Sequence, residues 1–196
     1  MKKVLKISTT ILLCILFLAS CSKEDEDGYR VYTINQGSHY SDGPLDKLFG
    51  NNNKASFWEW EVIFEPSCIY SESDLINPIN YLDVNKLIGF SDCGEYHSQY
   101  SCRVGWRASG DSIELLVYKR DDNNILFKPL KKVYPDEVVN VTLEFKDNIY
   151  VSCVDGKCDT LARPCPDWSG RKYSLFPFFG GDETAPHKMR IRIKNV

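Results

Sequence analysis

The sequence is poor in histidine and in basic charge. Only three of its 196 residues are histidines, His39, His97 and His187, and none lies in the context of a hydrolytic Ser-His-Asp triad. The 24 basic residues are outnumbered by 27 acidic ones, for a formal net charge of −3. This balance excludes a nucleic-acid-binding protein, because such proteins need a basic surface to neutralise phosphates.

Apolar residues are plentiful by comparison. The chain is 43% hydrophobic and contains 10 Phe, 11 Tyr and 4 Trp, which is enough for one well-filled core. A disordered chain has too few such residues to form a core, so disorder is excluded. The composition therefore predicts a single globular domain.

The start of the chain resembles a bacterial lipoprotein signal. A basic segment precedes the apolar run 11–19, which is too short to cross a bilayer, since a spanning helix needs roughly 20 apolar residues. Residues 18–21 (LASC) resemble the lipobox, in which the peptide before the cysteine is removed and the cysteine is acylated. The resemblance implies that residues 1–20 are a signal peptide and that Cys21 is the lipid attachment site.

An acidic run follows directly. Residues 22–28 (SKEDEDG) have a composition that stays solvated and acts as a flexible tether. The run resembles the acidic export signal of Bacteroidota surface lipoproteins, which implies attachment to the outer membrane with the domain facing the cell exterior. We therefore expect a lipidated tether over residues 21–28, a domain over 29–196, and contact with the membrane through the lipid anchor only.

The cysteines beyond the anchor fit an exported protein, because their number is even and therefore favours disulfides. An Asp-Gly turn at 155–156 places Cys153 opposite Cys158, so we expect this disulfide. The other four allow three pairings, among which the sequence does not choose: Cys68, Cys93, Cys102 and Cys165. No CxxC spacing supports a zinc site, and neither a metal nor another cofactor is expected.

Most of the domain shows the pattern of strands separated by turns. Trp58, Trp60 and Phe64 alternate with glutamates, the period-two pattern of a strand with one buried face. Further strands are expected over residues 102–108, 112–120, 125–133, 138–146, 149–154, 157–163, 171–178 and 187–195. Residues 83–88 look helical, with Asp83 as N-cap and Gly89 as the stop. The sequence predicts an all-β, two-sheet antiparallel β-sandwich of the jelly-roll type with one short helix.

The same alternation predicts the core. Ten residues are expected to face inward: Trp58, Trp60, Phe64, Trp106, Leu115, Val141, Leu143, Phe145, Ile191 and Ile193. Arg190, Arg192 and Lys194 alternate with the last two and are expected to form a solvated basic face. A one-residue error in strand phase would turn a whole set outward.

Three segments carry a family resemblance. They are residues 87–92 (LIGFSD) with His97, residues 101–107 (SCRVGWR) and residues 175–187 (LFPFFGGDETAPH). They look like a set found in poorly characterised secreted proteins of Bacteroidota, which resemble concanavalin-type lectin/glucanase jelly rolls. The resemblance implies a fold more firmly than an activity, because jelly rolls host lectins, hydrolases, lyases and structural modules.

Glu59, Glu61 and Glu65 approach the paired-glutamate strand motif of laminarinase-type glycosidases. Retaining hydrolysis needs two carboxyl groups about 5 to 5.5 Å apart, and same-face neighbours on one strand are separated by nearly that distance. The spacing departs from Glu-x-Asp-x-x-Glu, however. A charged solvent face opposite the tryptophans is the favoured interpretation.

A second group has the residue types for β-elimination on a uronic-acid polymer. It comprises His97, Gln99, Tyr100 and Arg103, with Arg107 further along the same strand face. Arginine or glutamine would neutralise the substrate carboxylate, and histidine and tyrosine would exchange protons. These residues are close in sequence and ill placed to surround a sugar ring, so a solvent face for the arginines is the alternative. We expect His97, Tyr100 and Arg103 to line the best polar cleft.

Residues 180–183 (GGDE) are expected to form a turn, because the two glycines tolerate positive φ. The letters resemble the GGDEF signature of diguanylate cyclases, but Thr184 stands where that signature has phenylalanine, and an exported all-β chain does not suit it. Calcium held by Asp182 and Glu183 fits the ligand chemistry, although no ligand spacing argues for it.

Two main functions are compatible with the sequence. A non-catalytic surface module that binds glycan is favoured, with loop aromatics such as Tyr96, Tyr100 and Trp168 as platforms for sugar rings. The alternative is a jelly-roll polysaccharide lyase or glycoside hydrolase; a structural or adhesive subunit cannot be separated from the first function. A groove lined by carboxylates, or by His, Tyr and Arg from different strands, would favour the enzyme.

Overall fold

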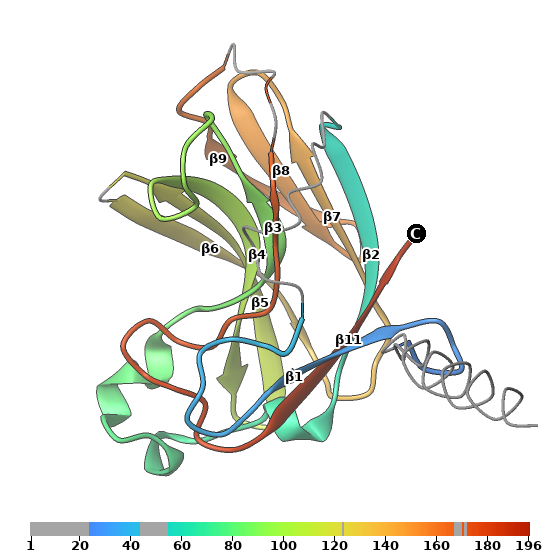
Figure 1. Cartoon of the computed structure of the whole chain (residues 1–196), viewed down its shortest axis with the longest axis vertical. Helices are drawn as coiled ribbons and strands as arrows, with labels where there is room; N and C mark the ends of the chain where they lie inside the picture. Colours follow the sequence, from blue (N-terminus) through green and yellow to red (C-terminus); the bar gives the residue numbers. More distant parts are fainter. Residues whose placement is uncertain (1–23, 44–54, 123, 167–169, 171) are drawn as a thin grey trace, which may run out of the picture.

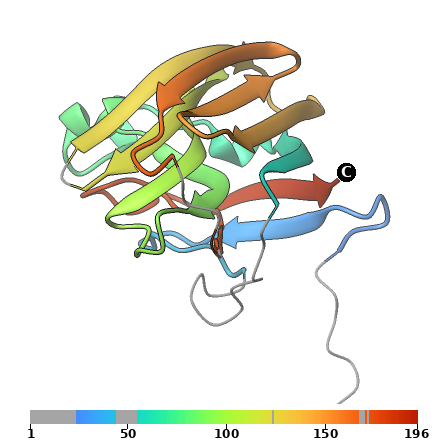
Figure 2. The same ribbon diagram turned by 90° about the horizontal axis from the view of Figure 1, so that it is seen from above.

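The computed structural model is a β-sandwich and describes residues 24–43, 55–122, 124–166, 170 and 172–196. Two antiparallel sheets pack face to face (Figure 1), and Figure 2 shows the layers from above. The predicted signal peptide, Cys21 and Trp168 lie outside the described residues. No helix in the described part of the chain is long and apolar enough to cross a membrane.

One sheet has six strands, and its central strands carry the strictest alternation of apolar and polar residues. Their order is β1 (Arg30–Ile34), β11 (Met189–Asn195), β2 (Phe57–Phe64), β7 (Val139–Phe145), β8 (Ile149–Val154) and β9 (Lys157–Ala162). In β7 every second residue is buried. This is the pattern of a sheet with one face on the core and one toward solvent.

The other sheet has five strands and is more deeply buried. Their order is β10 (Ser174–Leu175), β3 (Asn85–Ser91), β4 (Tyr100–Ser109), β5 (Ser112–Asp121) and β6 (Asn124–Val133). Three short 3-10 helices join β2 to β3: η1 (Pro66–Cys68), η2 (Glu72–Asp74) and η3 (Pro78–Leu82). The two sheets confirm the predicted all-β sandwich.

The core lies between the sheets and agrees with the predicted strand phase. Of the ten residues expected to be buried, all are buried except Trp58, which is half-buried. The Trp58 ring stacks on Phe90 of the opposite sheet, with 3.8 Å between ring centroids. Trp58 lies near the start of β2, where the residues are less buried than at the end of the strand.

The helix predicted for residues 83–88 is wrong, because most of this segment belongs to strand β3. The helical turn comes earlier, in η3, where the Asn77 side chain accepts a hydrogen bond from the Ile79 N–H and a proline follows at the first position. Leu87 and Ile88 are buried in the core. A strand paired on both sides reads as a continuous apolar run, which periodicity alone cannot distinguish from a short helix.

Four of the six cysteines form disulfides. Cys153 and Cys158 are register partners across the β8–β9 turn and are joined, as the Asp-Gly turn predicts. A second disulfide links Cys93 to Cys165. The remaining two are unpaired and buried, Cys68 and Cys102, so a framework of six oxidised cysteines is not formed. Burial raises the pKa of both thiols, which keeps them protonated.

Candidate functional site

A cleft of about 370 Å³ lies on the outer face of the five-stranded sheet. Its floor comes from β3, β4 and β5, and its walls come from β6 and from loops near residues 40, 97 and 180. The side chains that line it are Tyr40, Lys86, His97, Ser98, Ser101, Arg103, Tyr118, Arg120, Ile125, Phe178 and Asp182, together with Gly181. Imidazole, phenol and guanidinium groups from different elements therefore meet in one cleft.

Strand register places the central residues of the floor side by side. Arg103 on β4 lies directly opposite Tyr118 on β5, and Ser101 lies opposite Arg120. Because side chains alternate between the two faces of a strand, all four point away from the core residues Cys102 and Val117. Cross-strand partners lie about 4.5 to 5.5 Å apart at Cβ, so the guanidinium and phenol groups can contact the same bound ligand.

A β-bulge brings Lys86 into the same cleft. The register of β3 against β4 shifts between Lys86 and Ile88, which leaves Leu87 as an extra residue. Strict alternation from Gly89, which pairs with Arg103, would turn Lys86 inward. The inserted residue shifts this alternation by one position, so Lys86 lies on the outer face together with Arg103. The Lys86 ammonium donates a hydrogen bond to the carbonyl oxygen of Gly180 at 2.7 Å.

The cleft is strongly cationic. Lys86, Arg103 and Arg120 line it, against the single carboxylate of Asp182. Burial, together with repulsion from Arg103 and Arg120, lowers the pKa of Lys86 from 10.5 to about 8. Burial also raises the pKa of the Tyr118 phenol, although the two arginines oppose this shift. The arrangement favours an anionic ligand, whose charge would relieve the repulsion among the three cations.

His97 is held at the end of the cleft by Tyr173. The Tyr173 hydroxyl accepts a hydrogen bond from the His97 backbone N–H at 2.6 Å and lies 3.0 Å from His97 Nδ1. The Ser101 hydroxyl donates to the His97 carbonyl oxygen at 2.9 Å. These contacts fix the position of the imidazole relative to the strand that carries Arg103.

A buried ion pair anchors the loop that leads to His97. Asp92 is fully buried and receives two hydrogen bonds from the Arg163 guanidinium, at 2.6 and 3.0 Å, and one from the Tyr150 hydroxyl at 2.8 Å. The Cys93–Cys165 disulfide joins the same two segments. Together these bonds tie the start of the His97 loop to the body of the sandwich.

The structure brings together only part of the predicted site. His97 and Arg103 line the cleft, whereas Gln99, Tyr100 and Arg107 do not. Tyr100 has the strand parity of the inward-facing Cys102, so it points away from the outer face. The Arg107 guanidinium is paired with Glu114 at 2.6 Å.

The residues of the cleft that sequence analysis missed include two cations and a phenol, Lys86, Arg120 and Tyr118. Tyr118 and Arg120 could have been found from the alternation of β5, where they share one face and pair with the face of Arg103. Lys86 gave a weaker signal, an isolated charge in an otherwise apolar strand. Its orientation depends on the bulge, which no local pattern indicates.

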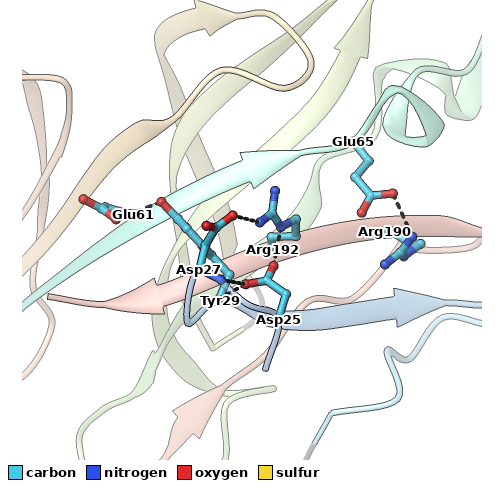
Figure 3. A network of polar contacts seen from close by, with 7 residues as sticks. All are labelled: Asp25, Asp27, Tyr29, Glu61, Glu65, Arg190 and Arg192. Atoms are coloured by element: carbon cyan, nitrogen blue, oxygen red, sulfur yellow. Dashed lines mark hydrogen bonds and ion pairs between the residues drawn. The ribbon is translucent and has the colours of Figure 1, made fainter. Parts of the chain in front are cut away.

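The glutamates of β2 lie on the opposite side of the sandwich. Glu59 accepts a hydrogen bond from the Asn140 amide at 2.8 Å, and Glu61 accepts one from the Tyr29 hydroxyl at 2.8 Å. Glu65 pairs with Arg190 at 3.4 Å, and Figure 3 shows this pair and the Glu61 contact. Because Glu59 and Glu61 lie on the solvent face of the six-stranded sheet, they cannot serve the cleft.

The acidic segment expected to be a solvated tether packs in part against β11. Arg192 donates to Asp25 at 2.6 Å and to Asp27 at 3.1 Å (Figure 3). Asp25 also accepts a hydrogen bond from the Tyr29 N–H at 2.9 Å. The basic face of β11 points outward as predicted, but the charge of Arg192 is neutralised by Asp25 and Asp27. The acidic segment is therefore not freely solvated at these two residues.

The loop after β10 forms a wall of the cleft. Gly180 has φ of +69°, the left-handed conformation expected of the turn, and its N–H donates to the buried Asn85 side chain at 2.5 Å. Glu183 is buried and accepts a hydrogen bond from the Asn77 N–H at 2.7 Å. In the described part of the chain, one group of three potential metal ligands occurs, Asp92 with Cys93 and Cys165, whose sulfurs are joined in the disulfide.

Comparison with known proteins identifies the fold. No family model matches the sequence, and no curated protein does. Among solved structures, the chain is similar to alginate lyase AlyC3 (TM-score 0.54, 11% identity, 87% of this chain and 74% of that one). It is also similar to the laminarinase catalytic domain from Thermotoga maritima (0.51, 9%, 86% and 76%) and to alginate lyase AlyA1 from Zobellia galactanivorans (0.50, 10%, 87% and 76%). The protein has the jelly-roll fold of these polysaccharide-active domains.

These findings correct the expectation of a non-catalytic glycan-binding module. The three solved structures named above are two alginate lyases and a laminarinase catalytic domain. The cleft also gathers His97, Arg103 and Tyr118 from a loop and two strands, which is the arrangement that favours an enzyme. The catalytic alternative is therefore the better supported one.

Proposed function

We propose that this protein is a polysaccharide lyase that cleaves an acidic polysaccharide by β-elimination. The observation that carries the proposal is the cross-strand pair of Arg103 and Tyr118, which shares one cleft with His97. The similarity of fold to alginate lyases supports the reaction class. It does not identify the polymer, because the sequences differ at about nine of ten positions.

The cleft holds a group for each step of the elimination. Arg103 and Arg120, with Lys86, bind the uronate carboxylate and stabilise the negative charge that develops on it. His97 takes the proton from the carbon next to the carboxylate, and the electron pair of that C–H bond forms a C=C bond. The glycosidic C–O bond breaks in turn, and Tyr118 donates its proton to the leaving oxygen. The raised pKa of Tyr118 keeps the phenol protonated for this role.

Hydrolysis is less well supported by the same cleft. A retaining glycosidase needs two carboxyl groups about 5 to 5.5 Å apart across the scissile bond. Among the described residues that line the cleft, Asp182 is the one carboxylate, beside three cations. Such a cleft is complementary to an acidic polymer rather than to a neutral glucan.

The test is to incubate the purified protein with a panel of acidic polysaccharides. A lyase generates an unsaturated uronate at each new chain end, which is followed by its ultraviolet absorbance. Tyr118→Phe should reduce this rate on the order of 100-fold while polymer binding is retained, because the phenol acts as the acid. Tyr134→Phe, at an exposed position outside the cleft, is the control. New reducing ends without ultraviolet absorbance would show hydrolysis and overturn the proposal.

We also propose that the enzyme is a lipoprotein of the outer membrane, anchored through Cys21 and facing the cell exterior, in the manner of Bacteroidota surface lipoproteins. The lipobox-like residues and the acidic run after them support this location. Cys21→Ser should release the protein from the membrane fraction or leave the signal peptide uncleaved. Protease added to intact cells should digest the domain; full protection of the domain would contradict the outward orientation.

A further inference from the structure

The catalytic cleft continues into a second hollow of different character. This hollow, of about 390 Å³, shares Lys86, Tyr118, Ile125, Gly181 and Asp182 with the first. The residues that it adds are Leu82, Asp83, Val84 and Phe127. The added residues bring one carboxylate and no further cation. The second half of this groove therefore has two carboxylates, Asp83 and Asp182, beside Lys86, whereas the first half has three cations beside Asp182.

The apolar wall is exposed in the protein as it stands. Leu82, Ile125 and Phe127 are 64%, 47% and 43% exposed. Ile125 and Phe127 lie on β6 opposite Arg120 and Tyr118, so they extend the rows of side chains that form the cleft floor. A ring stacked on this wall would contact the catalytic tyrosine at its edge.

Arg107 holds the wall together without supplying a charge to it. Its Nη1 donates to the Leu82 carbonyl oxygen at 2.9 Å, and its guanidinium lies 6.0 Å from the centre of the Phe127 ring. The charge is neutralised by Glu114, through contacts of 2.6 and 2.8 Å. The wall is thus preorganised, and the Arg107 charge beside it is already paired.

The acids of the second half disfavour another carboxylate. Asp83 and Asp182 both line it. Burial raises the pKa of Asp83, Lys86 opposes this, and Asp182 and Glu183 raise it further, so the negative charges already repel one another. Carboxylates accept hydrogen bonds from sugar hydroxyls, and apolar side chains cover the C–H face of a sugar ring.

We propose that this half is a subsite for an uncharged sugar, so that the substrate is an acidic heteropolysaccharide in which uronate and uncharged sugars alternate. The inference rests on the proposed lyase function and names its substrate class. The cationic half binds the uronate that is cleaved, and the apolar and acidic half binds its uncharged neighbour. A homopolymer of uronate would place a carboxylate against Asp83 and Asp182.

The test compares two kinds of polymer with the purified protein. One is an alternating polymer of glucuronate and a 6-deoxyhexose, and the other is a homopolymer of uronate, each assayed for unsaturated chain ends and for binding by calorimetry. We expect at least a tenfold preference for the alternating polymer in both assays. Phe127→Ala should abolish most of this preference, because it should weaken binding of the alternating polymer more than binding of the homopolymer.

Leu126→Ala is the matched control, since Leu126 is the next residue on β6, is 48% exposed and does not line the groove. Equal use of both polymers, or equal effects of the two substitutions, would overturn the subsite while the lyase function stands. Failure to bind or cleave any acidic polymer would instead overturn the lyase function.

Discussion

Arg103 and Tyr118 face each other across β4 and β5, on the outer face of the five-stranded sheet. Neither residue is near the other in sequence, and each is close to fully buried, at 5% and 4% exposure. Burial of the guanidinium carries a desolvation cost, because the charge leaves water. A carboxylate bound at this point of the groove would lie against a positive charge that is shielded from solvent.

Loss of the Arg103 charge should slow catalysis without unfolding the domain. We expect Arg103→Gln to lower the rate of cleavage of acidic polymer on the order of 100-fold, because the guanidinium stabilises charge that develops in the transition state. Arg190→Gln removes the same charge from the opposite face of the sandwich, where Arg190 pairs with Glu65. Equal rates for the two variants would contradict the role of Arg103.

Gly89 leaves the space that Arg103 occupies. A Cβ at Gly89 would lie 2.6 Å from Arg103 Cα and 3.0 Å from Arg103 Cγ, and it would clash with the Cys102 carbonyl oxygen. We expect Gly89→Ala to cost about 1 to 3 kcal/mol of the free energy of unfolding, since backbone atoms must move.

Gly181→Ala provides the comparison for stability, because its Cβ would approach nothing closer than Asp83 Oδ2 at 3.5 Å. Urea denaturation of both variants measures the difference. A Gly89→Ala protein as stable as Gly181→Ala would show that the β3–β4 contact is more plastic than its geometry implies.

The buried charge of Lys86 should destabilise the folded protein, although the proposed function uses that charge. Its pKa falls from 10.5 to about 8 in the folded protein, so the unfolded chain binds the extra proton between these two values of pH. Relative to Lys86→Met, the native protein should therefore gain stability as pH rises from about 8 to 10.5, and carry the full penalty below pH 8.

Thermal unfolding across this pH range checks the prediction. At neutral pH, Lys86→Met should melt no lower than the native protein and bind acidic polymer more weakly. A melting temperature that drops by several degrees at neutral pH would mean that the hydrogen bond to Gly180 outweighs the repulsion from Arg103 and Arg120.

The buried ion pair between Asp92 and Arg163 should be the most sensitive polar contact of the fold. Asp92→Ala leaves Arg163 and Tyr150 without their acceptor, and breaking a buried pair in this way costs about 3 to 5 kcal/mol. Asp159→Ala breaks the exposed pair with Lys128 and should cost no more than about 1 kcal/mol. Equal decreases in the denaturant midpoint of Asp92→Ala and Asp159→Ala would contradict this ranking.

Local sequence patterns predicted the strands whose two faces have different environments. The phase of β2, β7 and β11 was correct because apolar and polar residues alternate there. The pattern was lost in β3, which is paired on both sides and contains the bulge, and β1 was not predicted. The expected strand over residues 171–178 is reduced to the two residues of β10.

By itself the sequence determined the all-β class, the inward and outward faces of the alternating strands, and the Cys153–Cys158 bridge, because each depends on residues close together in the chain. Only the tertiary structure decided that Lys86 and Tyr118 join His97 and Arg103 in one cleft, and that Gln99 and Tyr100 do not line it. The reason is physical: strand register and a single bulge set which distant side chains meet, and these follow from the packing of two whole sheets.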